Sequence, residues 1–133
     1  MNLQLGPGLL EELIQDAKHA YPRESCGLLV GRGAAERFIA VKNISASSSE
    51  YEMDPAELIR AFRGLRESGE QLLAIYHSHP HGPAELSRKD IERAYYPEAA
   101  QLVISLSDPE HPRCTAFRVI DGRTLTIEVH AIV

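Results

Sequence analysis

Cysteine is scarce in this chain: Cys26 and Cys114 are the only two among its 133 residues. They lie far apart and form no Cys-x-x-Cys pair, which excludes a zinc site built from cysteines alone. We expect both to be small apolar residues in buried strands. Two cysteines without a disulfide framework favour a reducing compartment.

Long apolar runs are also missing. No stretch approaches the roughly 18 to 20 apolar residues that a membrane-spanning helix requires. Residues 1–8 contain no basic region followed by an apolar stretch, so no signal peptide is predicted. We therefore expect a cytoplasmic protein that does not have a membrane as a partner.

A concentration of positive charge is the third missing feature. The formal net charge is -5 with histidine neutral, whereas a nucleic-acid surface needs a concentrated basic face. The densest arginines, Arg60, Arg63 and Arg66, fall on a segment that is predicted to be a solvated helix. We therefore expect no nucleic-acid partner.

The composition is otherwise typical of a folded protein. Apolar residues make up 44% of the chain and charged residues 25%, far from the disordered range. The length suits one domain, and the sequence shows no repeat, linker or second domain. We expect residues 1–133 to form a single domain that is a monomer or a weak homodimer.

Apolar periodicity and capping residues predict three helices, over residues 7–20, 55–68 and 87–94. Pro7 suits the first turn of the first helix, and Pro22 ends it. Asp54 is a good cap for the second helix, which ends at Gly69.

Short apolar or alternating runs predict strands over residues 2–5, 26–30, 37–43, 71–79, 101–106, 115–120 and 124–130. Asp121-Gly122 is typical of the turn in a hairpin between the last two. The order of helices and strands predicts an α/β sandwich, with a mixed, largely antiparallel sheet flanked by helices.

Two histidines end the strand at residues 71–79. Side chains alternate along a strand, so His77 and His79 face the same side, roughly 6.6 Å apart at about 3.3 Å per residue. That spacing lets two imidazole nitrogens converge on one ion at about 2.0–2.1 Å. Pro80 stops the strand there, which places the pair at a strand end.

Asp90 lies one turn into the following helix, where its carboxylate can point back at the same place. Two histidines and one carboxylate leave an open fourth position, as a catalytic zinc site requires. Each part also has a simpler interpretation. His-x-His alone is a weak signal, and Ser87-x-x-Asp90 is close to a capping box. The complete spacing over strand, loop and helix favours a metal site.

The pattern His77-Ser78-His79-Pro80-x6-Ser87-x2-Asp90 resembles the motif of the JAMM (MPN+) metalloproteases at every defining position. Glu24, in Glu24-Ser25-Cys26-Gly27, is similar to the family's upstream glutamate. Without the resemblance Glu24 is hard to choose, because Glu85, Glu92 and Asp108 are also near possible site loops. The resemblance covers nearly the whole chain and implies the MPN/cytidine-deaminase-like sandwich.

The resemblance implies a zinc-dependent peptidase or isopeptidase with three metal ligands and two catalytic residues. His77, His79 and Asp90 hold Zn²⁺, Glu24 moves the proton of the attacking water, and Ser87 donates a hydrogen bond to the developing oxyanion. Small prokaryotic members imply a substrate with a Gly-Gly tail, a ubiquitin-like or sulfur-carrier protein. Leu29, Val30 and the loop 45–52 are candidates for the groove that binds the tail.

The histidine pattern also allows other interpretations. A zinc deaminase needs a Pro-Cys-x-x-Cys pair, which is absent, and a cupin needs a ligating Glu closer to the histidines than Glu85. His81 extends the His-x-His pattern, but Pro80 interrupts the alternation, so a substrate contact is expected of it. A metal-free MPN-type interaction scaffold is the remaining alternative, and the intact residue set argues against it.

Overall fold

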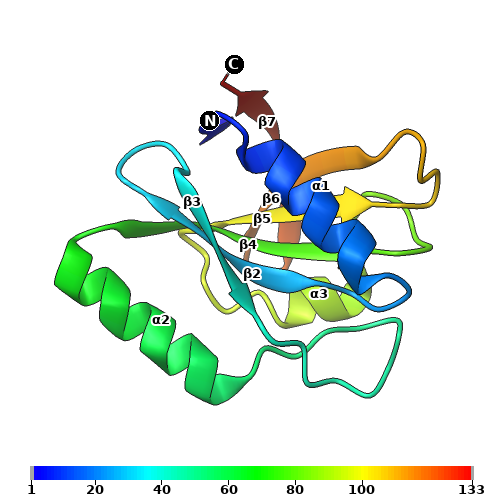
Figure 1. Cartoon of the computed structure of the whole chain (residues 1–133), viewed down its shortest axis with the longest axis horizontal. Coiled ribbons are helices and arrows are strands. Elements are labelled where there is room, and N and C mark those ends of the chain that lie inside the picture. Colours follow the sequence, from blue (N-terminus) through cyan, green and yellow to red (C-terminus); the bar gives the residue numbers. More distant parts are fainter. Residues whose placement is uncertain (1, 133) are drawn as a thin grey trace.

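The computed structural model describes residues 2–132, which form one seven-stranded sheet and three helices (Figure 1). Along the chain the elements are β1 (Asn2–Leu5), α1 (Leu9–Ala20), β2 (Cys26–Gly31), β3 (Arg37–Val41), α2 (Pro55–Ser68), β4 (Gln71–His79), α3 (Arg88–Glu92), β5 (Ala100–Ser105), β6 (Arg113–Ile120) and β7 (Arg123–Ala131). The strands are arranged in the order β1-β7-β6-β5-β4-β2-β3. No helix among the described residues is long and apolar enough to cross a lipid bilayer.

The sheet is mixed and largely antiparallel, which confirms the predicted fold class. β4 and β5 are parallel, as are β1 and β7, and the other neighbours are antiparallel. The two ends of the strand order approach each other, because Ala35 forms backbone hydrogen bonds with Gln4 and Gly6 at 2.8 and 2.7 Å. The sheet is therefore strongly curled, in line with the right-handed twist of strands.

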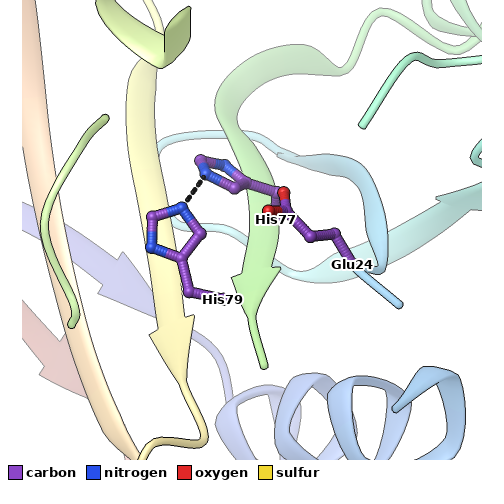
Figure 2. Close-up of side chains that lie close together, drawn as sticks. All are labelled: Glu24, His77 and His79. Carbon is purple, nitrogen blue, oxygen red and sulfur yellow. Dashed lines mark hydrogen bonds between the residues drawn. The ribbon is translucent and has the colours of Figure 1, made fainter. Parts of the chain in front are cut away.

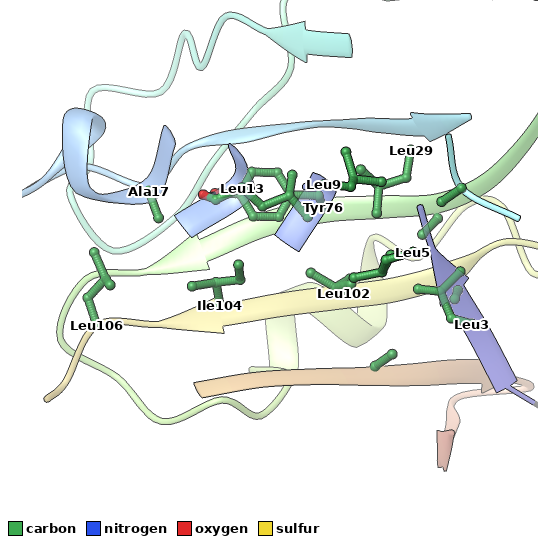
Figure 3. Close-up of a cluster of buried hydrophobic side chains, with 14 residues drawn as sticks. Leu3, Leu5, Leu9, Leu13, Ala17, Leu29, Tyr76, Leu102, Ile104 and Leu106 are labelled. Atoms are coloured by element: carbon green, nitrogen blue, oxygen red, sulfur yellow. Dashed lines mark hydrogen bonds between the residues drawn. The ribbon is translucent and has the colours of Figure 1, made fainter. Parts of the chain in front are cut away.

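Helix α1 covers one face of the sheet. Leu9, Leu13 and Ala17 recur every four residues, so they form one stripe, and all three are buried. Figure 3 shows this stripe lying over side chains of β4 and β5, among them Tyr76 and Leu102. This cluster is the larger of the two hydrophobic cores.

The opposite face carries α2 and α3. Leu65 of α2 packs with Leu28 and Val30 of β2 and with Ile75 of β4 in the second core. Because side chains alternate along a strand, Leu28 and Val30 face α2 while Leu29, between them, faces α1. Figure 1 shows α1 in front of the sheet and α3 behind it.

Most predicted boundaries are confirmed to within two residues, and two helix predictions need correction. Helix α1 begins at Leu9 rather than at residue 7, because Gly8 adopts a left-handed φ of 78° and so cannot continue a helix toward Pro7. Helix α3 ends at Glu92, two residues before the predicted end. Asp54 caps α2 by accepting from the Ala56 amide at 2.9 Å, as predicted.

The two cysteines differ in their surroundings. Cys26 is buried in β2, as predicted, whereas Cys114 in β6 is only half-buried. Both are free thiols. Arg60, Arg63 and Arg66 are exposed on α2, which confirms that they belong to a solvated helix face.

Two glycine-to-alanine substitutions should change the free energy of unfolding in opposite directions. A Cβ at Gly27 would lie 2.4 Å from the Ile39 carbonyl oxygen, a backbone atom that cannot move aside, and 2.4 Å from the Phe38 ring. Gly27→Ala should therefore lower the free energy of unfolding by about 1–3 kcal/mol. Gly64, in α2, has open space around it, so Gly64→Ala should raise that free energy by roughly 0.5–1 kcal/mol. Urea unfolding of both variants measures the difference, and a neutral Gly27→Ala would contradict the close packing of β2 on β3.

Candidate metal centre

The two histidines at the end of β4 turn toward each other. His77 and His79 lie on the α3 side of the sheet, and their Nε2 atoms are 3.0 Å apart (Figure 2). The alternation of the strand puts both on one face, as the sequence predicts. His77 is fully buried, whereas His79 is 9% exposed, so only one of the two rings borders solvent.

Asp90 completes the cluster from α3. Its Oδ2 atom lies 3.1 Å from His77 Nε2 and 3.2 Å from His79 Nε2. The same oxygen accepts from the Ser87 amide at 2.8 Å, while the Ser87 hydroxyl accepts from the Asp90 amide at 3.1 Å. Ser87 and Asp90 therefore form a capping box, as the simpler interpretation predicts, and the cap also aims the carboxylate at the histidines.

The three facing atoms fit a small cation. Two imidazole nitrogens and one carboxylate oxygen form a triangle with sides of 3.0, 3.1 and 3.2 Å. Ligands at about 2.0–2.1 Å from one tetrahedral ion stand about 3.3 Å from each other, close to this triangle. The donor set of nitrogen and hard oxygen suits a divalent metal such as zinc.

A backbone hydrogen bond fixes the tautomer of His79. Its Nδ1 lies 2.8 Å from the carbonyl oxygen of Pro83. A carbonyl only accepts, so Nδ1 carries the hydrogen and donates it. In the neutral ring Nε2 then presents its lone pair to the cluster, which is how metal-binding histidines are usually held.

The protonation of the cluster favours anionic Asp90. Burial by itself would raise the pKa of Asp90, but its contacts with the His77 and His79 rings and the hydrogen bond from the Ser87 amide outweigh burial and hold that pKa well below its usual range. Burial lowers the pKa of His77 below its usual value. Burial also acts to lower the pKa of His79, yet its contacts with Asp90 and Pro83 raise it above the usual value.

Glu24 reaches the same cluster from the neighbouring strand. β2 pairs with β4 so that Cys26 lies opposite His77, and this register carries the residues just before β2 to the end of β4. Glu24 offers a carboxylate oxygen within 4.8 Å of nitrogens of both histidines (Figure 2). The residue is only 5% exposed, and burial raises the pKa of Glu24 to about 7. Its Oε1 has no hydrogen-bond partner among the described residues, which marks a place for a water or an ion.

A buried hydrogen-bond network on the α1 face of the sheet holds Ser25, the residue that follows Glu24. The hydroxyl of Ser78, on the face opposite the histidines, accepts from the Ser25 amide at 2.8 Å. The Ser25 and Tyr76 hydroxyls are 2.5 Å apart, and the Tyr76 hydroxyl donates to the Leu13 carbonyl of α1 at 3.2 Å. Sequence reasoning missed these residues, although Ser78 stands between the two histidines of the motif.

The cluster opens into a cavity of about 420 Å³. Two segments form most of its walls, Ser48–Ser49 and the loop from Pro80 to Ser87. Glu24 and His79 lie at its base. Of the other acidic candidates, Glu85 lines this cavity, whereas Glu92 and Asp108 are exposed and do not line it.

Two aromatic contacts border the site. His81 lines the cavity and packs its ring edge-on against Tyr21, with centroids 5.2 Å apart, so it stays outside the cluster. Tyr51 stacks on His77 with ring centroids 4.6 Å apart. The sequence places Tyr51 in the loop 45–52, a candidate for the tail groove, and does not predict its stack on His77, because a stack between a loop and a strand leaves no local pattern.

Solved structures share this fold. The solution structure of a protein from Desulfitobacterium hafniense superimposes with a TM-score of 0.88 and 34% identity, covering 99% of this chain and 93% of that one. A JAB1/MPN domain protein from Archaeoglobus fulgidus has a TM-score of 0.64 and 19% identity, covering 96% of this chain and 99% of that one. The second likeness bears on the fold alone.

Curated relatives extend the similarity to sequence. The CysO-cysteine peptidase of Mycobacterium tuberculosis is 29% identical over 127 residues, 93% of this chain and 87% of that protein. A probable TtuB-protein conjugate cleaving protease of Thermus thermophilus is 44% identical over 88 residues, 65% of this chain and 60% of that protein. A desampylase of Haloferax volcanii is 33% identical over 88 residues, 63% of each.

The family described as prokaryotic homologs of the JAB domain matches residues 7–120. This match spans most of both cores, the cluster of His77, His79 and Asp90, and Glu24. It confirms the resemblance that the His-Ser-His-Pro motif indicates. The chain belongs to the prokaryotic JAB family.

Proposed function

We propose that this protein is a zinc-dependent peptidase or isopeptidase that hydrolyses an amide bond at the C-terminal tail of a ubiquitin-like or sulfur-carrier protein. The observation that carries the proposal is the triangle formed by His77 Nε2, His79 Nε2 and Asp90 Oδ2, with sides of 3.0–3.2 Å and an open cavity beside it. These three residues would hold the metal.

The chain's own residues divide the chemistry between them. A bound zinc ion would act as a Lewis acid and would lower the pKa of the attacking water toward about 7. Glu24 accepts the proton of the attacking water and delivers it to the leaving amine, a role that its buried position beside the histidines supports. The Ser87 hydroxyl, on the cavity wall, donates to the carbonyl oxygen as that oxygen becomes negative.

The substrate class follows from the relatives. They include a CysO-cysteine peptidase, a probable TtuB-protein conjugate cleaving protease and a desampylase, and we infer from these names a substrate that is a ubiquitin-like or sulfur-carrier protein. We extend that class to this chain, with a Gly-Gly tail as the part that enters the site. A tail without side chains would approach the metal between Ser48–Ser49 and the loop 81–86, which both line the cavity.

One predicted part of the tail groove is wrong. Leu29 and Val30 are fully buried, because β2 lies inside the sheet between β4 and β3 rather than at an edge. They cannot contact a substrate. The other part of that prediction, the loop 45–52, contributes Ser48 and Ser49 to the cavity wall and stays in the proposal.

We also propose that residues 1–133 form one domain and that the protein works in the cytoplasm. The first proposal is supported by the sheet, which includes strands from both ends of the chain. The second is supported by the free thiols of Cys26 and Cys114, which a reducing compartment preserves.

Removing one ligand should abolish metal binding. His77→Ala, His79→Ala and Asp90→Ala each leave two of the three donor atoms, so we expect stoichiometric zinc in the purified protein to fall from one ion per chain to nearly none. Zinc is measured by elemental analysis after purification without added metal. A control, His111→Ala, changes an exposed histidine outside the cluster and should leave zinc unchanged. A wild-type protein free of zinc would favour the metal-free scaffold instead.

Glu24→Gln should separate metal binding from turnover. The amide keeps the size of the carboxylate but does not accept the proton of water, so we expect full zinc occupancy and a rate lowered by about 10²–10⁴-fold. The assay incubates each variant with fusions of ubiquitin-like proteins carrying a Gly-Gly tail, and mass spectrometry locates the cut. Normal cleavage by Glu24→Gln would show that another group is the base. Glu85→Gln is the matched control. Glu85 also lines the cavity, but it lies outside the group formed by Glu24, His77 and His79.

A further inference from the structure

We propose that Tyr51 is the positioning residue for His77, holding its imidazole by ring stacking in place of a hydrogen bond. This inference rests on the proposed function, because it treats His77 as a metal ligand. It assigns a task to a loop residue that lies 26 positions before the motif and touches none of the reacting atoms in the scheme above.

His77 lacks the usual orienting hydrogen bond. Metal-binding histidines almost always donate their second ring N–H to a carbonyl, a carboxylate or a water, which fixes the plane of the ring. His79 follows this rule through Pro83. The Nδ1 atom of His77 is buried, and it has no partner among residues 2–132. No protein group among these residues therefore orients the His77 ring through Nδ1.

The ring of Tyr51 supplies an orienting contact. Its centroid lies 4.6 Å from that of His77, and the two planes are inclined by 25°, a stacked arrangement. His79 meets the His77 ring edge-on, with centroids 4.8 Å apart. A flat ring against one face resists rotation of the imidazole about its Cβ–Cγ bond, since turning the ring out of plane would collide with the tyrosine.

Tyr51 is itself anchored on both sides. Just before it, Glu50 pairs with Lys89 and, at 4.0 Å, with Arg93, and both partners flank Asp90 on or beside α3. Just after it, the Glu52 amide donates to the Asn43 side chain at 3.0 Å. The segment is therefore tied at one end to the helix that carries Asp90 and at the other to the chain leaving β3.

The same ring separates His77 from a neighbouring hollow. Tyr51, Met53, Leu58 and Tyr96 help to line a second cavity of about 400 Å³, to which His77 does not contribute. His77 is 0% exposed. Removing the ring would take away the flat surface against which the imidazole rests and leave the His77 ring free to turn toward this hollow.

The test compares two substitutions at one position. Tyr51→Phe keeps the stack, so its zinc affinity should stay within about twofold of wild type. Tyr51→Leu keeps apolar bulk but removes the ring, and its affinity should fall by about 10–100-fold, the usual effect of losing an orienting partner. Affinity is measured by competition with a chromophoric chelator. Long-range ¹H–¹⁵N spectra of the metal-free proteins should show one His77 tautomer in wild type and Tyr51→Phe, and exchange-broadened signals in Tyr51→Leu.

Two controls keep the outcomes distinct. Circular dichroism and thermal unfolding of the metal-free proteins identify loss of fold, and Tyr51→Met replaces Tyr51→Leu if the latter is unfolded. Glu50→Gln removes only a partly exposed ion pair and should weaken zinc binding by no more than about fivefold. If wild type binds no zinc, the proposed function fails. If wild type binds zinc and the folded ringless variant binds it equally tightly, only the role of Tyr51 is overturned.

Discussion

The pairing of β2 with β4 is the constraint on which the site depends. The two strands run antiparallel with Cys26 opposite His77, so the chain just before β2 meets the end of β4. This register brings Glu24 to the two histidines although more than 50 residues separate them in sequence. A shift by one residue would turn every side chain of β2 to the wrong face.

The two faces of β4 carry different side chains, the proposed metal ligands on one and a hydrogen-bonding serine on the other. One face presents His77 and His79 to Asp90, whereas the other places Ser78 against the Ser25 amide. The hydrogen bonds on the second face lock the strands together directly behind the cluster. Burying three titratable groups in contact is unfavourable unless a partner satisfies them, and one divalent cation would satisfy all three.

The local parts of this architecture were predictable, and the parts set by tertiary contacts were not. The sequence predicted Asp54, His77, His79 and the Ser87–Asp90 cap correctly in position, because periodicity and capping are short-range. Choosing Glu24 among four acidic residues required the family resemblance, because no local sequence pattern indicates which strand lies beside β4. The groove prediction at Leu29 failed for the same reason: an apolar run does not reveal whether a strand is at the edge or inside the sheet.

The central claim is that two imidazoles and one carboxylate share a single cation. Crystals of the protein purified without added metal, measured on both sides of the zinc absorption edge, test it most directly. The account predicts one anomalous peak at about 2.0–2.2 Å from Nε2 of His77, Nε2 of His79 and a carboxylate oxygen of Asp90. Zinc-soaked crystals with no peak among these three atoms, or with the peak elsewhere, would contradict it.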